Sequence, residues 1–258
     1  MGLLLLGLMA AQAQPDSAWQ IQKHRHFLVY YEAGAAQQAG AVGRAAESSY
    51  RRIMLDLDFK KHTGFWLWDE RVKIYVYASV ARFREATGAP LWTRALASHR
   101  THSVALGGND PDLLDSVLPH ELTHLIFRDF LGLGDSVPDW LHEGVAQREE
   151  KYGLAQSITL LRGLQQHDRL IPLADLMTLT SEQAARERRA LVFYAEAVSL
   201  VSFMIDEQGA ERFRRFCGQL RDGKDMASAL RFTYPASLHS IEALERAWLA
   251  YLDRSTRR

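Results

Sequence analysis

The sequence has too little cysteine and too little net charge for several classes of protein. A single cysteine among 258 residues cannot form an internal disulfide or supply a thiolate metal cluster, so any metal site must use histidine and carboxylate ligands. The 31 basic and 31 acidic residues cancel, which argues against a nucleic-acid or anionic-membrane binder. The hydrophobic content of 47% is typical of a globular chain that buries a substantial core.

An apolar run at the amino terminus is too short to cross a bilayer. Residues 3–11 are apolar and lead into Ala11-Gln12-Ala13, a small-residue pattern typical of signal-peptide cleavage, although no basic residue precedes the run. We therefore expect a signal peptide over 1–13, cleavage near Ala13, export to the periplasm or the exterior, and no stable membrane span. A buried N-terminal strand or helix is the alternative.

The rest of the chain shows strand patterns first and helical patterns afterwards. In the first part, we expect strands at 26–32, 71–78 and 99–106 and helices at 35–57 and 80–87. Later helices are expected at about 112–131, 139–151, 154–165, 190–207, 210–221 and 237–254. This order predicts one α+β domain over 14–258, with a small mixed sheet and helices in about 20–135 and a mostly helical part in about 136–258.

The segment His120-Glu121-Leu122-Thr123-His124 is an HExxH motif. Positions i and i+4 share one face of a helix, so both imidazoles can reach one ion, and neutral imidazole is a preferred ligand of Zn²⁺. Glu121 lies off that line, where it can contact a metal-bound water as a general base. The apolar flanks indicate a largely buried helix, which argues against the alternative of two surface histidines and a glutamate.

Pro119 directly precedes the motif. A proline removes a helical N–H and clashes with the carbonyl four residues back. We therefore expect the helix to kink or restart near Asp115.

A third metal ligand is expected from the segment WLHEG at 140–144. The 18 residues from 125 to 142 allow the chain to turn and bring a second helix against the first. Glu143 is favoured as the third ligand, because two histidines, one glutamate and an open position form a recurring catalytic set. His142 is the alternative, although it lies about 100° round the helix. Gln147 shares the face of Glu143 and could accept the outer N–H of a ligating imidazole.

The two metal motifs resemble those of a known group of enzymes. HELTH followed by PDWLHEG and AQREE is similar to the gluzincin metallopeptidases, specifically the peptidase MA-like group, which is related to the M1 aminopeptidases. The resemblance covers most of the chain and implies a zincin-like fold, with one Zn²⁺ held by His120, His124 and Glu143 and with Glu121 as general base. The G-x-M-E-N segment of the M1 aminopeptidases is missing, so an aminopeptidase is not supported.

Hydrolysis of a peptide also needs a donor to the developing oxyanion. Tyr194 is the candidate, because related enzymes often use a tyrosine from a later helix, and an ordinary core tyrosine is the alternative. His99 and His102, on the strand expected before the motif, are second candidates. Cys217 is interpreted as a small buried hydrophobe.

Three functions compete on these residues. We expect a zinc metallopeptidase that acts on peptide or protein substrates and has no nucleic-acid partner. The alternative is a zinc-binding, catalytically weak module for peptide binding or assembly. The intact Glu121 favours the enzyme, because a purely structural site has no use for that base. The complete set of two histidines and two glutamates disfavours a metal-free helical binding protein.

Overall fold

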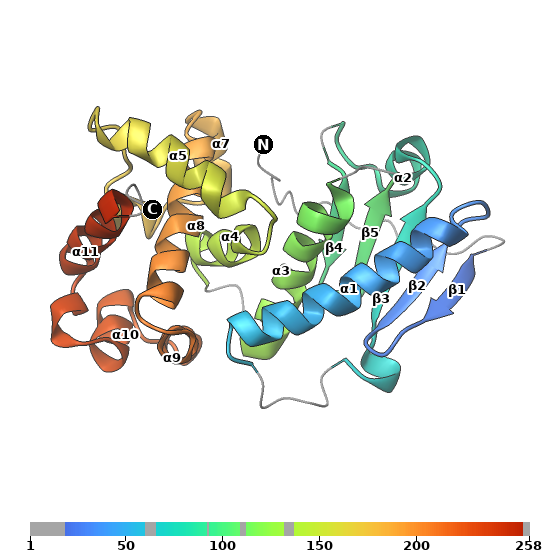
Figure 1. Cartoon of the computed structure of the whole chain (residues 1–258), viewed down its shortest axis with the longest axis horizontal. Helices are drawn as coiled ribbons and strands as arrows, with labels where there is room; N and C mark the ends of the chain where they lie inside the picture. The colour runs from blue at the N-terminus through green and yellow to red at the C-terminus, as the bar shows by residue number, and fades with distance from the viewer. Residues whose placement is uncertain (1–18, 60–65, 92, 109–111, 132–136, 255–258) are drawn as a thin grey trace. The chain divides into compact units, whose positions relative to one another are not determined.

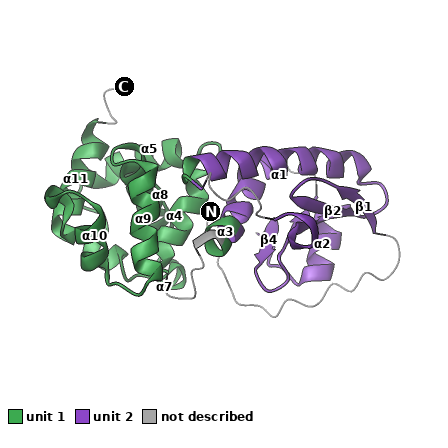
Figure 2. Cartoon of the chain, turned by 90° about the horizontal axis from the view of Figure 1, so that it is seen from below, with its two compact units in different colours: residues 1–5, 56–58, 126–258 green, residues 6–55, 59–125 purple. Residues whose placement is uncertain are grey.

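A computed structural model describes residues 19–59, 66–91, 93–108, 112–131 and 137–254 (Figure 1). The signal peptide expected over 1–13 lies outside these residues. The described chain divides into two compact units (Figure 2). The sheet unit comprises 19–55 and 59–125, and the helical unit comprises 56–58 and 126–254.

The sheet unit contains a mixed five-stranded sheet with the order β1-β2-β3-β5-β4. The two central pairings, β2 with β3 and β3 with β5, are parallel, whereas both outer pairings are antiparallel. The strands are β1 (Gln20–Lys23), β2 (Phe27–Tyr31), β3 (Val72–Tyr77), β4 (Ala95–Ser98) and β5 (Ser103–Gly107). Strand β1 was not expected from the sequence, while β2 and β3 confirm the predicted strands.

Helices cover the two faces of the sheet. Helix α1 (Ala36–Asp56) lies across the face on which β2 and β3 bury alternate side chains (Figures 1 and 2). Phe27 contacts Tyr50 of α1 there, with ring centroids 6.3 Å apart. Helix α2 (Val80–Thr87) packs Phe83 over Gly107, where a Cβ would lie 2.7 Å from the ring. A glycine is therefore required at the end of β5.

The strand expected over 99–106 is wrong in its first half. Residues His99 to His102 form the turn of a hairpin between β4 and β5, and His102 has a left-handed φ of 50°. The segment contains no glycine or proline that would mark a turn. Its alternating side chains therefore predicted a strand instead of a turn. The 3₁₀ helix η1 (Trp68–Glu70) precedes β3.

The helical unit is organised around α8, whose residues from Phe193 to Ile205 are all buried. Helices α4 and α5 pack against α8, and a helix that is apolar all round belongs in a core. The elements are α4 (Asp139–Arg148), α5 (Gly153–Gln165), α6 (Leu173–Leu176), α7 (Ser181–Arg186), α8 (Ala190–Asp206), α9 (Ala210–Arg221), α10 (Met226–Thr233), η3 (Ala236–Leu238) and α11 (Ile241–Arg254). The long helices match the sequence expectations, whereas α6, α7 and α10 were not expected.

The expected fold class is confirmed, since a small mixed sheet is followed by a mostly helical part. Among the described helices, none combines the length and the apolar character needed to cross a membrane.

Candidate metal centre

The HExxH motif lies on α3 (Leu118–Leu131), which follows a π-helical turn, η2 (Leu113–Val117). The Val117 N–H donates to the Asp112 carbonyl at 3.1 Å, one residue further back than in an α-helix. This wider turn precedes Pro119, which has no N–H to donate. Where a kink or restart was expected near Asp115, the helix changes from π to α at Leu118 without a break.

Helix α3 presents both histidines from within a buried surface. The side chains of Leu118, Leu122 and Leu125 are fully buried, and His120 and His124 are only 4% and 6% exposed. Their Nε2 atoms are 3.0 Å apart and share a hydrogen bond. The motif thus directs two imidazole nitrogens at the same point, as its i, i+4 spacing predicts.

Helix α4 carries Glu143 and is anchored at both of its ends. Asp139 in the first turn accepts hydrogen bonds from the N–H and the hydroxyl of Ser181, at 2.8 and 2.9 Å. Arg148 in the last turn forms a bidentate ion pair with Asp206 of α8, at 2.7 and 3.1 Å. These contacts fix the direction of the helix that presents Glu143.

Gly144 sets the distance between α4 and α8. A Cβ at this position would lie 2.5 Å from the Ala197 carbonyl oxygen and 2.8 Å from the Val201 side chain. Only glycine therefore lets the backbone beside Glu143 approach α8 so closely. The neighbouring Glu143 is 2% exposed.

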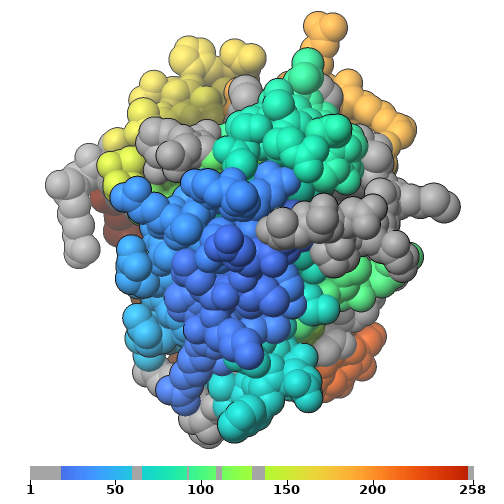
Figure 3. All heavy atoms as spheres, turned by 90° about the vertical axis from the view of Figure 1, so that its right-hand side faces the viewer, coloured from blue at the N-terminus to red at the C-terminus, as the bar shows by residue number. Residues whose placement is uncertain are grey.

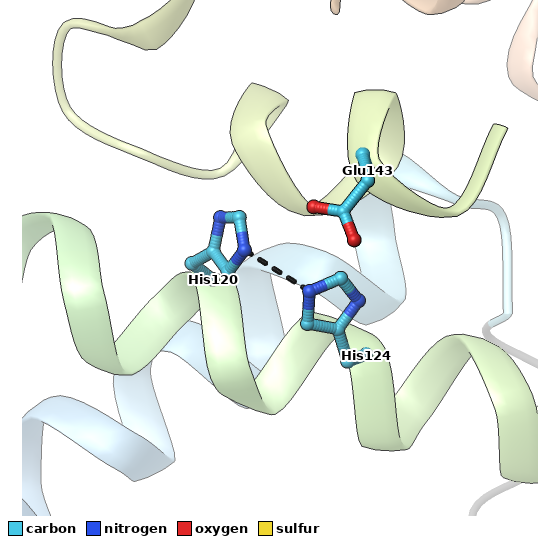
Figure 4. Close-up of side chains that lie close together, drawn as sticks. All are labelled: His120, His124 and Glu143. Atoms are coloured by element: carbon cyan, nitrogen blue, oxygen red, sulfur yellow. Dashed lines mark hydrogen bonds between the residues drawn. The ribbon is translucent and has the colours of Figure 1, made fainter. Parts of the chain in front are cut away.

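The three expected metal ligands form one group. One ligand atom each from His120, His124 and Glu143 lie within 4.8 Å of one another, and the Glu143 carboxylate faces the two imidazoles (Figure 4). Nitrogen ligands about 2.05 Å from a tetrahedral Zn²⁺ are roughly 3.3 Å apart, a few tenths of an ångström more than the two Nε2 atoms here. Donor set, burial and spacing thus fit a metal ion.

His142, the alternative ligand, is not in this group. Its ring lies 5.9 Å from that of Phe127. Helical rotation separates the two neighbours on α4, so only one of them joins the histidine pair.

Glu121 is 5% exposed and outside the ligand group. Its Oε2 accepts a 2.9 Å hydrogen bond from the backbone N–H of Ala97 in β4. Sequence reasoning missed Ala97, because a backbone donor carries no signature in the sequence.

Tyr194 lies on α8 in the same unit as Glu143 and is 8% exposed. Burial raises the pKa of its hydroxyl, and the charges of Glu143 and Asp139 raise it further. The side chain therefore lies within electrostatic reach of a candidate ligand. His99 and His102 lie in the β4–β5 turn, and the His102 ring contacts Trp66 at 5.3 Å.

Two other sequence expectations have clear outcomes. Gln147 was expected to accept a hydrogen bond from the N–H of a ligating imidazole. This hydrogen bond is absent, because the buried Gln147 Oε1 has no hydrogen-bond partner among the described residues. Cys217 is fully buried, and burial raises the pKa of its thiol, as expected for a small hydrophobe.

A comparison with protein-family models agrees with these features. The family model of the Peptidase MA superfamily matches residues 56–253, which include HExxH, Glu143 and Tyr194. No curated protein matches the sequence. Among solved structures, yeast LTA4 hydrolase in complex with Bestatin is similar, with 14% identity and a TM-score of 0.43 over 93% of this chain and 37% of the yeast chain. The chain thus spans little more than a third of that protein. A metal ion is implied by the family and by the donor set, and the match over most of its length shows that the chain belongs to the Peptidase MA superfamily.

Proposed function

We propose that this protein is a zinc metallopeptidase that hydrolyses peptide bonds in peptide or protein substrates. The observation that carries the proposal is the buried group of His120, His124 and Glu143, whose ligand atoms lie within 4.8 Å of one another. Membership of the Peptidase MA superfamily supports the reaction class. Three protein ligands leave a tetrahedral ion one open position, which is typical of catalytic zinc sites.

Each side chain has a separate task in this reaction. His120, His124 and Glu143 would hold the ion, which, when bound, acts as a Lewis acid on the scissile carbonyl and on water. Glu121 accepts the proton of the attacking water and passes it to the leaving amine. The Tyr194 hydroxyl donates a hydrogen bond to the developing oxyanion.

The decisive experiment compares the wild type with Glu121→Gln, which preserves the shape of the side chain and removes its basicity. Both proteins should bind one zinc ion, measured by atomic emission on the purified chain. Only the wild type should cleave a mixed peptide library, and the variant should lose at least about 100-fold in kcat. A wild type that binds zinc without cleaving peptides supports a peptide-binding or assembly module, and a wild type that binds no zinc contradicts both.

We also propose that the protein works outside the cytoplasm. The support is the apolar run over 3–11 followed by Ala11-Gln12-Ala13. Mass spectrometry of the protein purified from a secreting host should find Gln14 at the new amino terminus. An intact amino terminus on protein retained in the cytoplasm would contradict export.

A further inference from the structure

We propose that Ala97 is a positioning residue for Glu121. The Ala97 N–H holds one oxygen of the carboxylate, Oε2, at 2.9 Å. The other oxygen then keeps a fixed direction from which to accept a proton. This inference rests on the proposed function, since it assigns Ala97 a task in the same reaction.

The pairing of β4 with β5 explains why this N–H is available. Opposed residues in an antiparallel pair alternate between those that exchange hydrogen bonds and those that do not. The Gly107 N–H donates to the Arg94 carbonyl at 3.0 Å, and the register then makes Ala97 and Val104 a pair without ladder bonds. The Ala97 N–H therefore points away from β5, at the edge of the sheet.

The two edges of this sheet are used differently. Strand β1 forms one edge, and three of its four residues are exposed, on the side of the molecule that Figure 3 shows in blue. Strand β4 forms the other edge, where Ala97 is half-buried and its N–H is paired with a buried carboxylate. Edge donors normally bond to water, so this pairing is a specific contact between β4 and the first turn of α3.

A backbone donor suits a general base better than a cationic side chain would. A buried carboxylate needs donors, but an arginine or lysine would neutralise its charge and compete for the oxygen that accepts the proton. The Ala97 N–H carries no net charge. Because it belongs to the backbone of a strand, it cannot move away through a change of side-chain rotamer. Misplacement of a catalytic group by about 1 Å can cost on the order of 100-fold in rate.

The kinetic test removes the donor with Ala97→Pro, because proline has no N–H and is tolerated in edge strands. We expect kcat to fall about 10- to 100-fold while KM stays within about 2-fold and the zinc content is unchanged. The matched control is Ala95→Pro, which removes an N–H of the same orientation two residues earlier and should keep the wild-type kcat. Equal losses in both variants, an unchanged kcat in Ala97→Pro, or a raised KM with unchanged kcat would overturn the proposal. The last result would assign the N–H to substrate binding.

A second measurement needs neither folding of the proline variant nor peptidase activity. Amide hydrogen exchange at Ala97 should be at least about 10-fold faster in Glu121→Ala than in the wild type, because the acceptor is gone. Glu121→Gln retains an acceptor oxygen and should restore slow exchange. An exchange rate at Ala97 that is the same in Glu121→Ala and in the wild type would contradict the hydrogen bond from Ala97 to Glu121. If the exchange responds but the wild type cleaves no peptide, the proposed function fails while the contact stands.

Discussion

The helix that carries the two candidate histidine ligands and the helix that carries Glu143 are positioned in different ways. His120 and His124 share one helix, so the spacing of a single motif sets the relation between their rings. Glu143 sits on α4, whose direction depends on Asp139, Gly144 and Arg148 and on their partners elsewhere in the helical unit. The relative placement of the two histidines is therefore set locally in the sequence, whereas the placement of Glu143 depends on packing.

This difference predicts two kinds of failure. A change in the histidine pair removes a ligand and leaves the fold of its unit nearly intact. A change beneath α4 leaves every ligand in the sequence but moves Glu143 and destabilises the helical unit. Measuring zinc affinity and the free energy of unfolding on the same variants separates these cases.

The largest effect is expected for His124→Ala, which deletes one of three ligands. Zinc affinity should fall by more than about 100-fold, the upper end of the loss seen when only a partner of a ligand is removed. Isothermal titration of the apoprotein with zinc measures this. His142→Ala is the matched control, because it removes a neighbouring imidazole outside the ligand group. Equal losses in the two variants would show that the ligand group is wrongly assigned.

The next effect is expected for Gly144→Ala, which places a methyl group against the Ala197 carbonyl. Overpacking of this kind costs about 1–3 kcal/mol, and the shift of α4 should also weaken zinc binding. The control is Gly163→Ala in α5, where a Cβ meets nothing within 4 Å and the change should stabilise the helix by about 0.5–1 kcal/mol. Urea unfolding of both variants gives the comparison, and equal stabilities would refute the close approach.

The smallest effect for a single step in conditions, about 1 kcal/mol per pH unit, is expected for Glu196→Gln on α8. Glu196 is fully buried, its Oε1 accepts from the Ile171 N–H at 2.7 Å, and burial raises the pKa of its carboxyl to about 8 from 4.5, with the Glu245 charge adding to the rise. The folded state therefore keeps a proton that the unfolded chain loses. Between about pH 4.5 and pH 8, this group makes the protein less stable as the pH rises, by at most about 1.4 kcal/mol per pH unit.

Glutamine keeps the acceptor for Ile171 and cannot ionise. The difference in free energy of unfolding, variant minus wild type, should therefore increase by about 1 kcal/mol per pH unit from pH 5 to pH 8. Urea titrations at several pH values measure the slope, which is independent of any constant cost of the substitution. Parallel curves for the two proteins would contradict the raised pKa.

The parts of the fold that were predictable are those whose sequence pattern lies within a single helix or strand. The helix at 35–57 and the strand at 71–78 have a periodicity that only one secondary structure satisfies, and Pro119 signals the change of helical type before the motif. The turn from His99 to His102 was missed because a left-handed φ at a histidine follows from the hairpin and not from a turn residue. The prediction that Gln147 accepts a hydrogen bond from a ligating imidazole was also wrong, because residues on one helical face can still point at different neighbours.

The spacing in HExxH requires two imidazoles on one face of a helix, because backbone hydrogen bonding sets the rotation per residue wherever that helix forms. No such rule selects Glu143 over His142, or turns the Ala97 N–H toward Glu121. Those choices depend on the rotation of α4 against α8 and on the outer edge of β4, which long-range packing and strand register decide.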